Sequence, residues 1–207
     1  MSTGNVREDG SAASRADRAL FKLESGLNLV AGLVILTVML LSVANILLRK
    51  FFNWPVPGYI DWMISAVPLM AFLGISFTQR LGGHIRMDLL VSRLKGRALW
   101  IAEFIGILGI MLITLVLIYG SWDHAMRALN FGDSTGDIRL PTWPVKIVVP
   151  ICLAILAVRL GLQLWAYGRA VRTGEDEPVA VPLIEDAASQ AAHEAETVSG
   201  LEDEAQR

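Results

Sequence analysis

"SGLNLVAGLVILTVMLLSVANILL", residues 25–48, is a run of 24 residues without one charged side chain. As an α-helix it would be about 36 Å long, enough to cross the roughly 30 Å hydrocarbon core of a bilayer. Further long apolar stretches lie at about 60–79, 98–122 and 145–168, the last of which includes Arg159. The sequence therefore predicts an all-α integral membrane protein with four transmembrane helices.

The composition agrees with a membrane protein. Hydrophobic residues make up 54% of the 207-residue chain and charged residues only 18%, whereas a soluble domain carries about 25% charged residues. The single cysteine, Cys152, lies inside an apolar run. This excludes a disulfide framework and a thiolate metal site, and we expect Cys152 to be a small core residue.

The segments that flank the predicted membrane domain, residues 25–168, are polar. Residues 1–24 carry four basic residues, and Ser14 and Asp17 could form a capping box, so we expect a cytoplasmic tail with a short interfacial helix. The first span is expected to be retained, because it is longer than the apolar core of a signal peptide. Residues 169–207 are predicted to be a disordered cytoplasmic tail, since Glu175 to Arg207 holds ten acidic residues and one basic residue.

The orientation follows from the basic residues. With the N-terminus inside, the inner segments hold eleven Lys and Arg residues and the outer loops hold five. The positive-inside rule therefore places both termini in the cytoplasm. All six tryptophans fall near predicted span ends, where an aromatic belt in the headgroup layer is expected.

The connector between spans two and three, residues 79–97, contains five basic residues. After Gly82–Gly83, its apolar residues recur at helical spacing along one face, which predicts an amphipathic helix in the membrane interface that binds anionic lipid. His84, Arg86 and Asp88 lie here without a nucleophile or a glycine-rich phosphate loop nearby, so we assign them a structural or partner-contact role. The three histidines of the chain lie outside the span centres, which argues against haem. We expect no enzyme activity, no metal and no cofactor.

Besides Asp61 and Lys146 at the outer span ends, two charged residues fall within predicted spans. An unpaired charge costs about 2.5–3.5 kcal/mol near the bilayer centre. Glu103 in span three and Arg159 in span four are expected to pair if these spans pack side by side; an ion or proton pathway is the alternative. Each belongs to a stripe of mainly small or polar residues that is expected to face protein: Glu103, Gly106, Ile110 and Thr114 in span three, and Cys152, Leu156, Arg159 and Gln163 in span four. Asp61, at the outer end of span two, could pair with Arg49 or Lys146.

Three segments in this order resemble the small membrane subunit of TRAP transporters, the DctQ-like family. They are "LLRKFFNWPVPGYID" after span one, "GGHIRMDLL" after span two and "LPTWPVKIVVP" at the start of span four. The resemblance covers roughly residues 15–170. Where that family often has Glu near the start of span two, this chain has Asp61.

The resemblance implies a component of a tripartite, sodium-coupled symporter for organic acids in the bacterial inner membrane. A periplasmic binding protein would capture the substrate, and a large membrane subunit would carry it. The small subunit would scaffold the large one and help to dock the binding protein. On this basis Asp61, His84, Arg86, Asp88 and Trp143 are candidate structural or subunit-contact residues, as are Glu103 and Arg159 from their place within the spans.

The outer loop, residues 123–143, is the candidate surface for the binding protein, with Asp133, Asp137 and Arg139 as contact residues. Two other functions remain open from the sequence. One is the small four-span subunit of a different tripartite carboxylate transporter. The other is a small channel or exporter formed by oligomers of the chain, although the polar residues are too patchy to line one span along its full length. The anchor of a redox complex is disfavoured by the histidine positions.

Overall fold

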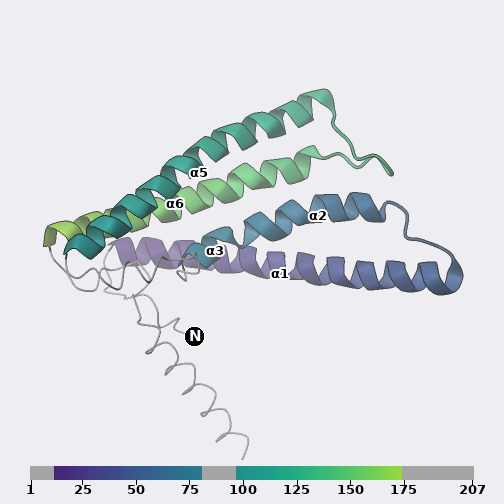
Figure 1. The fold of residues 1–207 in the computed structure, drawn as a ribbon, viewed down its shortest axis with the longest axis horizontal. Coiled ribbons are helices and arrows are strands. Elements are labelled where there is room, and N and C mark those ends of the chain that lie inside the picture. The colour runs from purple at the N-terminus through teal and green to yellow at the C-terminus, as the bar shows by residue number, and fades with distance from the viewer. Residues whose placement is uncertain (1–11, 81–96, 174–207) are drawn as a thin grey trace, which may run out of the picture.

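The computed structural model describes residues 12–80 and 97–173, all of its regular structure being helical (Figure 1). The helices are α1 (Ala12–Phe52), α2 (Tyr59–Leu73), α3 (Ile75–Arg80), α5 (Arg97–Phe131) and α6 (Trp143–Thr173). Four helical stretches are long and apolar enough to cross a membrane, with α2 and α3 together forming the second. The prediction of an all-α protein with four candidate spans is therefore confirmed.

Several predicted features lie outside the described residues. These are the interfacial helix of the connector together with His84, Arg86 and Asp88, and the acidic tail from residue 174 onward. The short interfacial helix expected before span one is part of α1, which runs without a break for 41 residues, or about 60 Å. Ser14 and Asp17 accordingly lie inside α1 rather than at its cap. Similarly, α5 continues nine residues past its predicted end at residue 122, so the outer loop itself is only residues 132–142.

The helices pack as two antiparallel pairs, α1 with α2 and α5 with α6, and α6 also contacts α2 and α3 (Figure 1). The main core lies between α5 and α6 and includes Ile107, Leu153 and Leu160. A smaller core joins α1, α2 and α6 through Ala31, Leu73 and Cys152. Thus α6 is the central helix of the bundle, and Cys152 is a core residue as predicted.

The tryptophans only partly follow the expected aromatic belt. Five of the six keep 38–69% of their surface exposed. Of these, Trp54, Trp62 and Trp143 lie near helix ends, whereas Trp122 and Trp165 lie nine and eight residues before the ends of α5 and α6. Trp100 lies near the start of α5, but it is 6% exposed and stacks on Tyr167 of α6, with 5.9 Å between the ring centroids. Position near a span end does not reveal which side of the helix a tryptophan occupies, and Trp100 faces the neighbouring helix.

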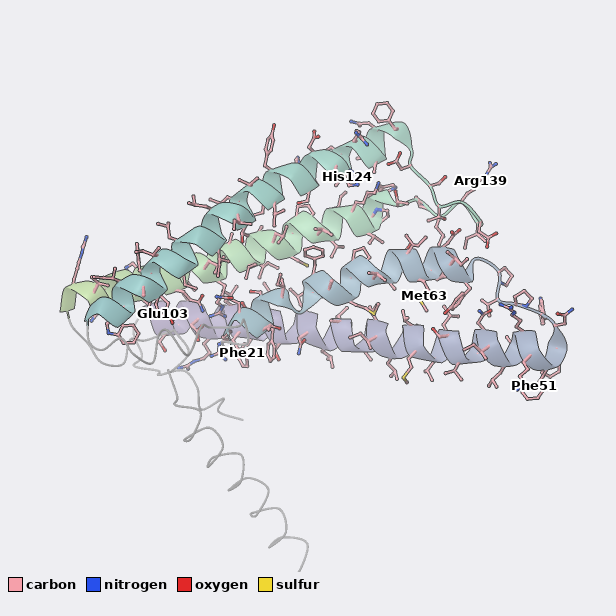
Figure 2. All side chains as sticks on the ribbon, viewed as in Figure 1. Phe21, Phe51, Met63, Glu103, His124 and Arg139 are labelled. Atoms are coloured by element: carbon pink, nitrogen blue, oxygen red, sulfur yellow. The ribbon has the colours of Figure 1, made fainter. Side chains whose placement is uncertain are left out.

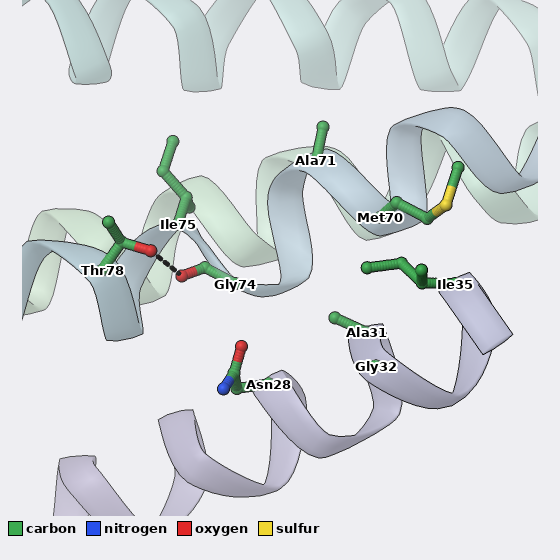
Figure 3. A pocket seen from close by; sticks show the side chains of 9 residues that line it. All are labelled: Asn28, Ala31, Gly32, Ile35, Met70, Ala71, Gly74, Ile75 and Thr78. Atoms are coloured by element: carbon green, nitrogen blue, oxygen red, sulfur yellow. Dashed lines mark hydrogen bonds between the residues drawn. The ribbon is translucent and has the colours of Figure 1, made fainter. Parts of the chain in front are cut away.

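A shallow groove of about 440 Å³ runs between α1 and the α2–α3 junction, with Asn28, Met70 and Thr78 among its lining residues (Figure 3). Gly74 interrupts the helix at this junction, and its carbonyl oxygen accepts the Thr78 side-chain hydroxyl at 3.1 Å. A Cβ at residue 74 would lie 3.3 Å from the Asn28 Oδ1. The absence of a side chain at Gly74 therefore allows α1 and α2 to approach closely at this level.

Candidate functional site

Four charged side chains are buried together where α1, α3 and α6 meet. Asp17 and Glu24 come from α1, Arg80 from α3 and Arg159 from α6, and each is 3% exposed or less. Their formal charges sum to zero. Buried charges are tolerated only when they are paired and hydrogen-bonded. The partners of each charge therefore show which helices this cluster joins. We refer to these four residues as the charge network.

Arg159 is the centre of the charge network. Its Nε donates to the Glu24 Oε1 at 2.9 Å and its Nη2 to the Oε2 at 2.5 Å, which is a bidentate arrangement. Its Nη1 donates to the Asp17 Oδ1. Asp17 and Glu24 are seven residues apart, so both lie on one face of α1. One guanidinium thus holds two turns of α1 against α6.

The helix α3 is attached to the same face of α1. The Arg80 Nη2 donates to the Asp17 Oδ2 at 2.9 Å, and the Ser76 hydroxyl donates to the Glu24 Oε1 at 2.5 Å. The Arg80 guanidinium also lies 3.9 Å from the ring centroid of Phe21, a cation–π distance. Each carboxylate therefore receives donors from both α3 and α6.

A neutral hydrogen bond completes the contact between α3 and α6. The Gln79 Nε2 donates to the Gln163 Oε1 at 2.9 Å, and both residues are buried. With this bond, every pair among α1, α3 and α6 is joined by a buried polar contact. The site is therefore a junction of three helices, and its polar groups are directed at one another.

The predicted partner of Arg159 is wrong. All three guanidinium nitrogens donate to carboxylates of α1, whereas Glu103 lies half-buried on α5. The physical reason lies in the two sides of α6. The polar stripe that contains Arg159 faces α1 and α3, while α5 packs against α6 through residues such as Leu160 and Tyr167.

The stripe on α6 is buried as predicted, since Cys152, Leu156, Arg159 and Gln163 are all 3% exposed or less. The stripe predicted on α5 is only partly correct. Thr114 is buried, but Gly106 and Ile110 are exposed in this chain. The buried face of α5 instead contains Trp100, Ile107 and Thr114. This face is rotated about the helix axis relative to the predicted stripe. Spans three and four do pack side by side, as expected.

Sequence reasoning missed Asp17, Glu24, Ser76, Gln79 and Arg80. A signal was present in α1, where Ser14, Asp17, Phe21 and Glu24 recur at helical spacing on one side, while the nearby basic residues lie on another. The assignment of residues 1–24 to a separate tail concealed this pattern. A buried face that continues from residue 14 into an apolar span indicates one helix rather than two.

At the other end of the bundle, Asp61 connects α2 to the outer loop. It is 2% exposed, and its Oδ2 accepts hydrogen bonds from the Thr135 hydroxyl at 2.7 Å, the Ile138 amide at 2.7 Å and the Asp137 amide at 3.1 Å. In return, the Asp137 Oδ2 accepts the Gly58 amide at 3.1 Å. We refer to Asp61, Thr135, Asp137 and Gly58 as the outer clasp.

The predicted ion pair of Asp61 with Arg49 or Lys146 is also wrong, because the carboxylate is satisfied by neutral donors of the outer clasp. Lys146 pairs with Asp133, with 3.0 Å between Nζ and Oδ2. Gly58 has a φ of +66°, and a Cβ there would come within 2.4 Å of the Ile138 side chain. The close approach of the two loops therefore requires a glycine.

The three docking candidates occupy different positions in the outer loop. Asp133 is bonded to Lys146, and Asp137 belongs to the outer clasp, so both stabilise the loop. Arg139 is exposed, with a φ of +53°, and lies on the loop near the start of α2 (Figure 2). Trp143 begins α6 and is 38% exposed.

Within residues 12–80 and 97–173, no group of three or more His, Cys, Asp or Glu could hold a metal ion.

One comparison with known proteins gives a match. The family model described as "Tripartite ATP-independent periplasmic transporters, DctQ component" matches residues 38–168. This range includes Asp61, Arg80 and Arg159, whereas Asp17 and Glu24 precede it. No curated protein matches the chain.

Proposed function

Because the chain belongs to the DctQ family, the small component of tripartite ATP-independent periplasmic transporters, we propose that it scaffolds the large membrane subunit and helps to dock the periplasmic binding protein. By the same family membership, we propose that the assembled transporter takes up organic acids by sodium-coupled symport across the bacterial inner membrane. The family match implies both partners, and the contacts within this chain support the scaffold and docking roles.

The observation that carries the scaffold role is the internal pairing of the buried charges. A subunit that conducts an ion or substrate needs polar groups along a path through the membrane. Here the charge network and the outer clasp lie at opposite ends of the bundle, and apolar side chains such as Leu73, Leu153 and Leu156 lie between them. The charges hold helices together, which supports a static role.

The outer clasp supports the docking role. Its hydrogen bonds fix the outer loop against the start of α2, so that Arg139 is presented from a defined backbone. The end of α1 and the turn that follows it expose Phe51, Phe52 and Trp54, which are 69–74% exposed. Arginine and aromatic residues are common at the energetically important positions of protein interfaces. We propose that this outer surface contacts the binding protein.

Both termini are proposed to be cytoplasmic. Counted over the sequence, eleven Lys and Arg residues fall in the proposed inner segments, including the connector outside the described residues, and five fall in the outer segments. The proposal also accounts for the position of the outer clasp, which would then face the periplasm, where a binding protein is found.

Co-purification tests the scaffold role. The tagged chain, extracted in detergent from cells that express the whole transporter, should retain the large subunit, and the purified chain alone should give no substrate flux in liposomes. Flux through the chain alone would favour the small channel instead. Recovery of a large partner from the other tripartite carboxylate system would also overturn the proposal.

The docking role is tested with Arg139→Ala, because the side chain of Arg139 can be removed without breaking the outer clasp. We expect binding-protein affinity to fall about fivefold or more, as for other arginines at interface centres. Arg172→Ala is the matched control, since Arg172 is exposed but lies at the opposite end of the bundle from the outer loop. If both variants bind alike, the outer loop is not the docking surface.

A further inference from the structure

The first turns of α1 sort their charged residues by sign. The acidic residues Asp17 and Glu24 are buried in the charge network, whereas Arg15, Arg18 and Lys22 are exposed. The three basic residues have the spacing i, i+3 and i+7, so they form one stripe along the helix. Since the acids are already neutralised inside the bundle, the outer surface of this segment is strongly basic.

The last turns of α6 add further positive charge at the same end of the molecule. Arg169 and Arg172 are exposed, and Arg159, earlier in α6, is bonded to Asp17. Because α1 and α6 run in opposite directions (Figure 1), the end of α6 and the start of α1 extend the same way from the charge network. We refer to the five exposed basic residues as the basic end: Arg15, Arg18, Lys22, Arg169 and Arg172.

A segment of opposite charge begins directly after α6. Residues 174–207 carry ten acidic residues and one basic residue, for a formal charge of −9. A segment of 34 residues can extend to at most about 110 Å. Thr173 lies 14 residues, or about 20 Å of helix, beyond Arg159, which is bonded to α1 beside the basic stripe. The tail is therefore long enough to reach the whole basic end.

We propose that the acidic C-terminal tail, residues 174–207, docks on the basic end formed by α1 and α6. The attraction is electrostatic, and the covalent link gives the tail an effective concentration in about the millimolar range. Phospholipid headgroups are the competing anions at this surface. The tail is favoured as the occupant because it combines a formal charge of −9 with attachment one residue beyond the basic end. The contact is independent of the transporter role.

Distances between two spin labels test this contact in the full chain. Cys152 is replaced by Ala, and single cysteines are placed at Ala19 of α1 and Ala188 of the tail. In nanodiscs of zwitterionic lipid at low salt, we expect a population of short distances. This population should fall about twofold or more in roughly 1 M salt, where the Debye length is about 3 Å.

Charge variants make the test specific. Arg15→Gln, Arg18→Gln and Lys22→Gln together should reduce the short-distance population about as much as high salt does. Glu175→Gln, Asp176→Asn and Glu177→Gln with Glu185→Gln and Asp186→Asn should also reduce it, and these changes leave all the described helices intact. Arg49→Gln with Lys50→Gln, at the other end of α1, is the matched control and should have no effect.

Two results would overturn the proposal. One is a distance distribution that neither the helix variant nor the tail variant changes. The other is loss of the short-distance population when the nanodiscs contain phosphatidylglycerol, which would mean that lipid headgroups occupy the basic end in an anionic membrane. Retention of the short distances in that lipid supports the tail as the occupant.

Discussion

Replacement of Arg159 by Met is the most informative single change. Met keeps an apolar stem but has neither the charge nor the donors of Arg. Of their hydrogen bonds at this junction, Glu24 then retains only that from the Ser76 hydroxyl and Asp17 only that from Arg80. The charge network changes from neutral to a net charge of −1 in a buried site. Removal of one partner from a buried pair costs about 3–5 kcal/mol. We expect a loss of stability of this size.

A free energy of about 3–5 kcal/mol corresponds to a change of roughly 10²-fold to 4,000-fold in the equilibrium between the closed junction and the state with α1 detached. Thermal unfolding in detergent should show the loss. Proteolysis should show faster cleavage near Arg15 and Arg18 as the first turns of α1 separate. Arg172→Met is the matched control, because an exposed arginine contributes at most about 1 kcal/mol.

A double variant separates lost pairing from lost packing. Arg159→Met combined with Glu24→Gln removes the uncompensated acid and leaves Asp17 paired with Arg80, so the buried site is neutral again. The double variant should recover most of the stability that Arg159→Met loses. The reasoning is refuted if Arg159→Met costs under about 1 kcal/mol, or if the double variant is no more stable than the single one.

Three further changes have defined outcomes. Asp61→Ala should lower the stability by about 1–3 kcal/mol, because the amides that donate to Asp61 lose their acceptor. Limited proteolysis of the outer loop should then be faster than in the unmodified chain, and equal cleavage rates would contradict the outer clasp. Gly58→Ala should destabilise the same loop by a similar amount, since φ is +66° and Ile138 occupies the space of a Cβ. Thermal unfolding measures this loss of stability, and an unchanged melting temperature would argue against the close contact between the loops. The double reversal Glu103→Arg with Arg159→Glu should be no more stable than Arg159→Glu alone, because Arg159 bonds to α1. If the double reversal regained stability, that result would support the pairing of Glu103 with Arg159 that the sequence predicted.

The sequence was sufficient for the number of membrane spans but not for the full length of α1 and α5 or for the contacts between helices. Charge-free runs predict spans because lipid offers backbone groups no hydrogen bonds, so length and hydropathy define the element. Burial of the stripe through Arg159 was also predictable from its polar residues. Its partner was not, because periodicity indicates which face of a helix is polar but not which neighbour covers that face. The same limit explains the rotated stripe of α5.

The outer clasp illustrates a second limit. Asp61 was identified as important because it is a charged residue at a span end, and charge suggested Arg49 or Lys146 as its partner. The structure satisfies it with two backbone amides and the Thr135 hydroxyl. Backbone donors carry no signature in the sequence, so a carboxylate that holds a loop looks the same as one that forms an ion pair. Gly58 gave the nearest clue, as a glycine in a turn beside that carboxylate.

Substrate uptake by the whole transporter in proteoliposomes tests the central claim most directly, namely that the buried charges of this subunit hold helices and do not carry substrate or ions. The neutral double variant Arg159→Met with Glu24→Gln, which keeps the Asp17–Arg80 pair, is compared with the unmodified chain. We predict the same KM for substrate and the same sodium dependence per assembled complex, with any loss confined to the amount of complex recovered. A changed KM or sodium dependence in fully assembled complexes would contradict the scaffold role.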